Sequence, residues 1–364
     1  MESLKLLFVG DIMPGGVLHY QEHFYTDEVK QFIKNFDLRI GTLEVAMGDN
    51  IPFDEEKMKG RMNIIYCKNC DIQKLLDLNI NIVSLANNHI FDLGIKGLEN
   101  TKKILSENNI KYCGAGKNIK EASEPVIIDY NGKHIVFLAY SDCDVSTMAY
   151  VPAATETSYG VNPLVIENVV ANIKYYKEKY DYVFVMPHWG KEYCVYPTKK
   201  MKDYSKMMID AGADMIIGSH THVVQPCIEY KSKKIFYSLG NFLFPDFYMN
   251  KPRPIWYPEK DYDFASIETT YDYPFPVTKP LKRVWRNFSR IGLMVCVDVN
   301  NNMITTKQNT ILQKDNILDL YKKQKNDFKM CILSILIKSP FYRGGIYLNK
   351  IQSMIYRICK YIRK

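Results

Sequence analysis

The chain has 364 residues, of which 47% are hydrophobic and 24% charged, and its formal net charge is +8. This length can bury a substantial core, as one large α/β domain or a domain with appendages. No run reaches the roughly 18 apolar residues that span a bilayer, and the first residues lack the pattern of a secretory signal. The nine cysteines are odd in number and scattered, which fits reduced thiols. We therefore expect a cytoplasmic protein.

In chain order, the pattern of apolar residues predicts alternating strands and helices, followed by hairpins. The predicted strands cover residues 6–9, 38–43, 80–86, 125–130, 133–139, 182–186, 215–217, 227–230, 234–238, 291–299 and 303–308. The predicted helices cover residues 26–36, 71–78, 97–108, 163–179 and 200–211, the first capped by Thr26. Asn131-Gly132 is a strong signal for a two-residue hairpin turn. This mixture indicates an α/β fold with a mixed sheet or paired sheets covered by helices.

Residues 251–290 do not follow this alternation. They contain six prolines, many tyrosines, Trp256 and Trp285. Long irregular segments inside compact domains are usually functional loops or disordered. Because this segment begins shortly after Gly240-Asn241-Phe242, we interpret it as a lid-like or substrate-facing insertion.

The basic charge is concentrated at the C-terminus. Residues 317–364 carry eight Lys and three Arg against two Asp, a net charge of +9, so the rest of the chain is close to neutral. The apolar residues of the last predicted helix share one face: Ile351, Ile355, Ile358 and Ile362. We predict a basic helical extension over residues 313–364 that either contacts the inner face of a membrane peripherally or packs on the domain. No specific nucleic-acid binding is expected, because no docking motif is recognisable.

Side chains that bind metals follow several of the predicted strands. Asp11 and Glu44 end the first two strands, and the remaining candidates follow later ones: Asn88, His89, His188, His220 and His222. Imidazoles and an amide are costly to bury without a partner and are good ligands for Mn, Fe or Zn. A carboxylate that bridges two divalent cations is the usual device of a dinuclear hydrolase, which generates a hydroxide nucleophile. His89 is left over, and we predict that it is the general acid for the leaving group.

Seven motifs occur in order along residues 4–310, and together they resemble one known family. They are Gly10-Asp11-Ile12-Met13, Thr42-Leu43-Glu44, Leu85-Ala86-Asn87-Asn88-His89 with Asp92 and Gly94, Gly114-Ala115-Gly116, Pro187-His188-Trp189-Gly190 with Glu192, Gly218-Ser219-His220-Thr221-His222, and Tyr237-Ser238-Leu239-Gly240-Asn241-Phe242. This set is similar to that of CapA-type (PGA_cap) capsule-synthesis proteins, a branch of the calcineurin-like metallophosphoesterases.

The resemblance implies a four-layer α-β-β-α sandwich over residues 1–312. It also implies a metal-dependent phosphoesterase-like hydrolase in the biosynthesis of a capsule or envelope polymer, such as poly-gamma-glutamate. Asp11 and Glu44 would be shared ligands of two metals. Asn88, His188 and His220 would complete one metal site, and His222 would serve the other.

The chain also departs from the pattern of the wider superfamily. Met13 stands where a histidine is usual, so the second metal site is expected to be weak. This favours the alternative function, a non-catalytic accessory subunit that binds polymer or a synthase. Three further patterns have modest predicted roles. Cys67 and Cys70 form a CxxC without a second pair. The spacing of His19 and His23 fits a surface helix. Glu192 would either orient His188 or lie at the surface.

Overall fold

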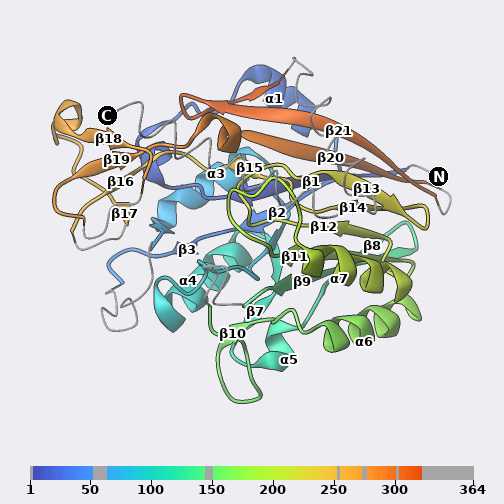
Figure 1. Ribbon diagram of the computed structural model, residues 1–364. Coiled ribbons are helices and arrows are strands. Elements are labelled where there is room, and N and C mark those ends of the chain that lie inside the picture. The colour runs from blue at the N-terminus through green and yellow to red at the C-terminus, as the bar shows by residue number, and fades with distance from the viewer. Residues whose placement is uncertain are drawn as a thin grey trace.

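The computed structural model describes residues 3–51, 64–143, 151–251, 255–272, 277–300 and 303–321. A large sheet of eight strands forms its centre (Figure 1), in the order β22-β21-β20-β1-β2-β5-β6, with β15 also paired to β1. The bounds are β1 Leu4–Ile12, β2 Leu38–Leu43, β5 Ile82–Ser84, β6 Lys111–Cys113, β15 Asn241–Leu243, β20 Ile291–Asn300, β21 Met303–Lys314 and β22 Ile317–Leu320. The core strands β1, β2, β5 and β6 are parallel, so their carboxyl ends meet at one edge.

A second sheet of six strands has the order β13-β14-β12-β11-β9-β8. Its strands are β8 Val126–Tyr130, β9 Lys133–Ser141, β11 Tyr182–His188, β12 Met215–Ile217, β13 Cys227–Tyr230 and β14 Lys233–Phe236. Asn131 and Gly132 join β8 to β9 with positive φ angles of 51° and 75°, as a tight two-residue turn requires. Strands β9, β11, β12 and β14 run parallel to one another.

Helices cover the outer faces of both sheets (Figure 1). The helices are α1 Asp27–Ile33, α3 Ile72–Asp77, α4 Gly94–Glu107, α5 Ile119–Ala122, α6 Ile166–Lys177 and α7 Lys199–Asp210, and the 3-10 helices are η1 Gly16–Tyr20, η2 Asn69–Asp71, η4 Phe264–Ser266 and η5 Asn287–Arg290. The hydroxyl of Thr26 accepts a hydrogen bond from the N–H of Val29, which confirms the predicted helix cap. None of the helices in the described ranges is both long and apolar enough to cross a bilayer.

Three buried apolar clusters separate these layers. Side chains of the large sheet, such as Phe8, meet Phe137 and Phe184 of the six-stranded sheet. The opposite face of the six-stranded sheet packs on α6 and α7. The opposite face of the large sheet packs on α1, α3 and α4. The order is therefore helices, sheet, sheet, helices, which confirms the predicted four-layer α/β fold.

Short strands surround these layers. Two pairs are β3 Ala46–Met47 with β4 Tyr66–Cys67, and β7 Ala115–Gly116 with β10 Gly160–Val161. The predicted insertion, interpreted as irregular, contains most of a small sheet in the order β17-β16-β19-β18, with β16 Phe247–Met249, β17 Ile255–Trp256, β18 Glu268–Thr270 and β19 Leu281–Arg283. At the other boundary, β22 continues the large sheet beyond residue 312 to Leu320. The predicted basic helix lies outside the described residues.

Candidate metal centre

The predicted site residues lie at the carboxyl ends of parallel strands. Asp11 is the penultimate residue of β1 and pairs with Thr42 of β2. Glu44 directly follows the last residue of β2. His188 ends β11, and the backbone of Ser219 bridges to it. The seven side chains predicted from the sequence, including His89, have exposed fractions between 0 and 9%. Two sheets thus deliver polar groups from distant parts of the chain to one buried region.

The loop after β12 adopts an unusual backbone to present its histidines. His220 and His222 have positive φ angles of 92° and 54°. Such values cost free energy for residues with a side chain and persist where the surroundings impose them, often at functional sites. The N–H of His220 donates to Oδ2 of Asp11 at 3.1 Å, which fixes this loop against β1.

One group of donors comprises Glu44, His188 and His220. Nε2 of His188 lies 3.4 Å from Oε1 of Glu44 and 3.1 Å from Nδ1 of His220. Oδ1 of Asn88 lies 2.7 Å from the same Nε2 atom. Ligands bound at about 2.0–2.2 Å from one ion are separated by roughly 2.8–3.6 Å, from octahedral to tetrahedral angles. These four donors therefore have nearly the spacing of a first coordination sphere.

Ser219 determines which nitrogen of His188 faces this group. Its Oγ lies 2.9 Å from Nδ1 of His188 and accepts a hydrogen bond from Oγ1 of Thr42 at 3.2 Å. A hydrogen bond with Ser219 lowers the pKa of Asp11. When the Ser219 hydroxyl donates to the Asp11 carboxylate, Nδ1 of His188 donates to Ser219 and Nε2 presents a lone pair to the donor group.

A second group comprises Asp11, Glu44 and His222. Nε2 of His222 lies 3.9 Å from Oε1 of Glu44. Nδ1 of His222 lies 2.9 Å from Oδ1 of Asn241, whose amide in turn donates to the carbonyl of Ser289. Asn241 therefore holds the imidazole with Nε2 directed at Glu44, as outer partners of metal-binding histidines do. Glu44 is a member of both groups, whereas Asp11 is a member of the second group only. The expectation that Asp11 is a ligand shared by both metals stays a prediction.

The electrostatics of this region fit divalent cations. Both carboxylate oxygens of Glu44 are buried and have no hydrogen-bond partner among the described residues. Burial, then the charge of Asp11, raises the pKa of Glu44 well above its usual range. Burial, opposed by the N–H of His220 and reinforced by Glu192, raises the pKa of Asp11 to about 8. A dication would satisfy these oxygens and reverse both shifts.

The imidazoles are correspondingly neutral. Burial, together with the surrounding histidines, holds the pKa of His188 and that of His222 well below the usual value, although Asn241 opposes the shift of His222. Burial, and then His89, lowers the pKa of His220 to about 3. Neutral imidazoles with available lone pairs are the form that binds metals.

His89 has a different environment from the other histidines. Nδ1 of the His89 ring lies 2.7 Å from Oδ2 of Asp92. The backbone N–H of His89 donates to Oδ1 of Asn87. No described group of metal donors includes it. Burial raises the pKa of Glu192, and the charge of His89 opposes this shift. The Nδ1 partner of His188 is Ser219, so Glu192 does not orient His188 through that atom.

The insertion contributes a buried arginine to this region. Arg283 of β19 is 2% exposed, and its guanidinium lies 3.7 Å from the ring centroid of Trp285. Its Nη2 donates to Oη of Tyr193 at 3.3 Å. The ring of Trp285 lies 4.9 Å from that of His222, and the charge of Arg283 acts on both Glu192 and His222. The insertion therefore places a positive charge beside the second donor group.

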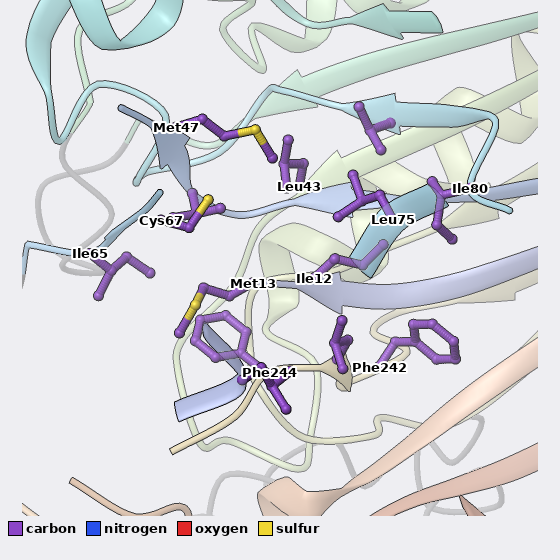
Figure 2. Packing of buried hydrophobic residues seen from close by; sticks show 14 of the residues in the cluster. Ile12, Met13, Leu43, Met47, Ile65, Cys67, Leu75, Ile80, Phe242 and Phe244 are labelled. Atoms are coloured by element: carbon purple, nitrogen blue, oxygen red, sulfur yellow. The ribbon is translucent and has the colours of Figure 1, made fainter. Parts of the chain in front are cut away.

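Met13 directly follows β1 and packs among apolar side chains. It is fully buried in the apolar cluster that also contains Ile12, Leu43 and Phe244 (Figure 2). Its thioether therefore packs in the core. The group around Asp11 and His222 has three carboxylate or imidazole donors among the described residues, as does the group around His188, and the weaker second site stays a prediction.

Four supporting residues had no role, or another role, in the sequence interpretation: Asp92, Ser219, Asn241 and Arg283. The first three lie inside the quoted motifs, and Asp92 follows His89 at the i+3 spacing that lets side chains meet in a helical turn. Arg283 had no comparable indication, because its segment has no motif and only the fold brings it to His222.

Comparison with known proteins identifies the relatives of this chain. Residues 5–246 match the family described as bacterial capsule synthesis protein PGA_cap. The chain is 34% identical to the capsule biosynthesis protein CapA of Bacillus anthracis, over 67% of this chain and 60% of the relative. It is 32% identical to the PGA biosynthesis protein CapA of Bacillus subtilis (strain 168), over 67% and 64%. It thus matches less than two thirds of the length of these relatives.

Two more distant similarities accompany these. A probable polyglutamine synthesis accessory protein of Mycobacterium tuberculosis is 28% identical over 47% of each chain. The structure of the NAD nucleotidase NadN of Haemophilus influenzae has a TM-score of 0.42 and 11% identity, covering 93% of this chain and 63% of that chain.

Proposed function

The chain belongs to the bacterial capsule synthesis protein family PGA_cap, and from this premise we propose that it is a divalent-metal-dependent phosphoesterase-like hydrolase of capsule or envelope-polymer biosynthesis. Its substrate would be a phosphorylated precursor or the polymer itself. The observation that supports this most strongly is Glu44, a fully buried carboxylate shared by two donor groups and lacking any hydrogen-bond donor among the described residues.

The two groups would hold two ions of Mn, Fe or Zn. Glu44, His188, His220 and Asn88 would hold one, and Asp11, Glu44 and His222 the other. When bound, such ions supply Lewis acidity to a phosphoryl oxygen and lower the pKa of water.

The protein's own residues would provide the remaining chemistry. His89 would donate a proton to the leaving oxygen, and Asp92 would hold its ring with Nδ1 protonated, which directs Nε2 to the substrate. Arg283 would bind the anionic group of the substrate, because a guanidinium pairs well with phosphate or carboxylate oxygens. Ser219 and Asn241 would keep the lone pairs of His188 and His222 directed at the ions.

The test combines metal counting with an assay. The protein is purified with Mn²⁺, its metal content is measured by elemental analysis, and it is assayed on phosphomonoesters and phosphodiesters. We expect about two ions per chain and hydrolysis that Glu44→Gln and His220→Ala abolish. His134→Ala, at the partly exposed start of β9, is the matched control. Hydrolysis that persists in Glu44→Gln at wild-type rate would exclude this centre as the catalyst.

A second candidate function is a non-catalytic accessory subunit that binds polymer or a polymer synthase through the same fold. The position of Met13 in the core favours it, since it leaves the second donor group with three ligands. Zero or one ion per chain together with no hydrolysis of any ester would support this function over catalysis.

The location of the protein forms part of the same proposal. We propose a cytoplasmic protein that contacts the inner face of the membrane through its basic residues after 321. A protein truncated after Tyr321 should lose binding to anionic vesicles while keeping its metal content. Equal vesicle binding by the truncated and intact proteins would contradict a membrane role for this segment.

A further inference from the structure

A second cluster of metal-binding side chains lies outside the two donor groups. It joins His19 of η1 to Cys70 and Asp71 of η2, although about fifty residues separate the two 3-10 helices. Nδ1 of His19 lies 2.9 Å from Oδ1 of Asp71 and 3.9 Å from Sγ of Cys70. One donor atom of each residue lies within 4.8 Å of the other two. Neither the His19/His23 spacing nor the CxxC alone provides enough ligands for a metal. The fold brings His19 of the first pattern to Cys70 of the second and adds Asp71.

Two of the donors, Asp71 and His19, are held in place by contacts outside the cluster. Oδ2 of Asp71 accepts from the N–H of Lys68 at 2.8 Å, which leaves Oδ1 to face His19. The ring of His19 lies edge-on to Tyr20 and Tyr257, each at a centroid distance of 5.0 Å. The hydroxyl of Tyr257 is itself fixed, because it donates to the carbonyl of Tyr66 and accepts from the N–H of Gly16. Asp71 and His19 are therefore preorganised by the surrounding structure, and Cys70 directly precedes Asp71 in the chain, on the exposed side.

The two cysteines of the CxxC have different surroundings. Cys67 is fully buried in the apolar cluster with Met13 and Met47 (Figure 2), so its thiol belongs to the core. Cys70 is exposed, Asp71 is buried and His19 is partly exposed. The cluster is therefore open on the side of Cys70, where an ion can enter and a water molecule can complete its coordination.

The chemistry of these donors selects among metals. Zinc binds imidazole nitrogen and carboxylate oxygen at about 2.0–2.2 Å and thiolate sulfur at about 2.3 Å, usually tetrahedrally, which separates the donors by roughly 3.3–3.6 Å. The observed separations of 2.9 and 3.9 Å lie on either side of this range, so small movements suffice. A thiolate favours zinc over manganese or magnesium.

We propose that His19, Cys70 and Asp71 form a zinc site with solvent as the fourth ligand, separate from the candidate metal centre. Zinc bound there joins the segment after β1 to the segment before α3. Because the unfolded chain does not hold these residues together, zinc binding stabilises the folded protein.

The test uses cobalt, which replaces zinc and reports thiolate ligation. The full chain is titrated with Co²⁺, and the near-ultraviolet thiolate-to-cobalt charge-transfer band is measured. The candidate metal centre contributes no such band, because its donors are oxygen and nitrogen atoms. We expect a band with the intensity of one thiolate-bound cobalt per chain, which Zn²⁺ removes and which excess Mn²⁺ leaves in place.

Variants decide the assignment. Cys70→Ser should abolish the band and His19→Ala should weaken it, whereas Cys227→Ser, at another partly exposed cysteine, should keep it in full. Glu44→Gln should also keep it, which separates this site from the proposed hydrolase. A folded intact chain without the band, or a band that survives in Cys70→Ser, would overturn the zinc site whatever the outcome of the phosphoesterase assay.

Discussion

Oδ1 of Asn88 lies 2.7 Å from Nε2 of His188, although the two residues are separated by 100 positions in the chain. When Nδ1 of His188 donates to Ser219, Nε2 carries a lone pair, as does the amide oxygen. Two acceptors at this distance repel each other unless a cation lies against both. We therefore expect one of the proposed ions to bind against both atoms, which makes Asn88 the first test of the centre.

Asn88→Ala should lower the metal content from about two ions to about one per chain. Loss of outer partners of metal ligands costs about 10–100-fold in affinity or activity, and we expect Asn88→Ala to cost at least as much in kcat/KM. Asn172→Ala, which removes a partly buried amide on α6, is the control and should change neither quantity. Two ions per chain in folded Asn88→Ala would show that the amide is not a ligand.

His89→Gln should reduce kcat on alkyl phosphate esters by about 10²–10⁴-fold, the usual contribution of a general acid. The loss should be far smaller on p-nitrophenyl phosphate, since that leaving group departs without a proton. Asp92→Asn should show the same dependence on leaving group with a smaller loss, because it acts through His89. Metal content should stay unchanged in both variants. An equal loss on both substrates would argue that His89 has only a structural role.

The buried carboxylates predict how the stability of the metal-free protein depends on pH. Asp11 has a pKa of about 8 in the folded protein and about 3.9 in the unfolded chain, so the folded state binds more protons between these values and stability falls as pH rises. The three buried histidines act oppositely, because their folded pKa values lie below about 6.5. Their contribution to stability rises with pH up to that value and is constant above it.

Between about pH 6.5 and pH 8 the histidine contribution to stability no longer changes with pH, and only the carboxylate contribution does. With EDTA present, the free energy of unfolding measured in urea should therefore decrease across this window. Asp11→Asn should flatten the decrease, and the control Asp142→Asn, at a buried carboxylate paired with Lys200, should preserve it. Mn²⁺ should reverse the trend, because metal ligands must be deprotonated. A metal-free stability that rises from pH 6.5 to pH 8 would contradict the raised pKa of Asp11.

Local chemistry made much of this structure predictable from the sequence. The cap of α1 by Thr26 and the β8–β9 turn at Asn131-Gly132 could be predicted, because each depends only on residues within a few positions in the sequence. Parallel strands place their carboxyl ends together, so Asp11 and His188 could be assigned to one region once the strands were recognised. The layers then followed from the apolar faces of the sheets and helices.

The remaining features depend on contacts between distant segments. No local pattern relates Arg283 to His222, because both are positioned through Trp285. The sequence pattern of residues 251–290 indicates an irregular segment, since the strands β17, β18 and β19 have only two or three residues each and the prolines between them obscure the alternation. Likewise, the neighbours of His19 are Cys70 and Asp71, which no spacing in the sequence could indicate.

Arg283 offers the clearest test of how the insertion contributes to substrate binding. A charge-assisted hydrogen bond contributes about 1.5–3 kcal/mol, so Arg283→Met should weaken inhibition by inorganic phosphate about tenfold to a hundredfold. KM for a phosphomonoester should rise similarly, while metal content is unchanged. Arg283→Lys should recover part of the affinity, because it keeps the charge but loses the planar contact with Trp285. Arg286→Met, which removes a partly exposed guanidinium paired with Asp272, is the matched control. If Arg283→Met folds, holds its metals and binds phosphate as tightly as the wild type, the arginine serves only to pack the insertion against Trp285.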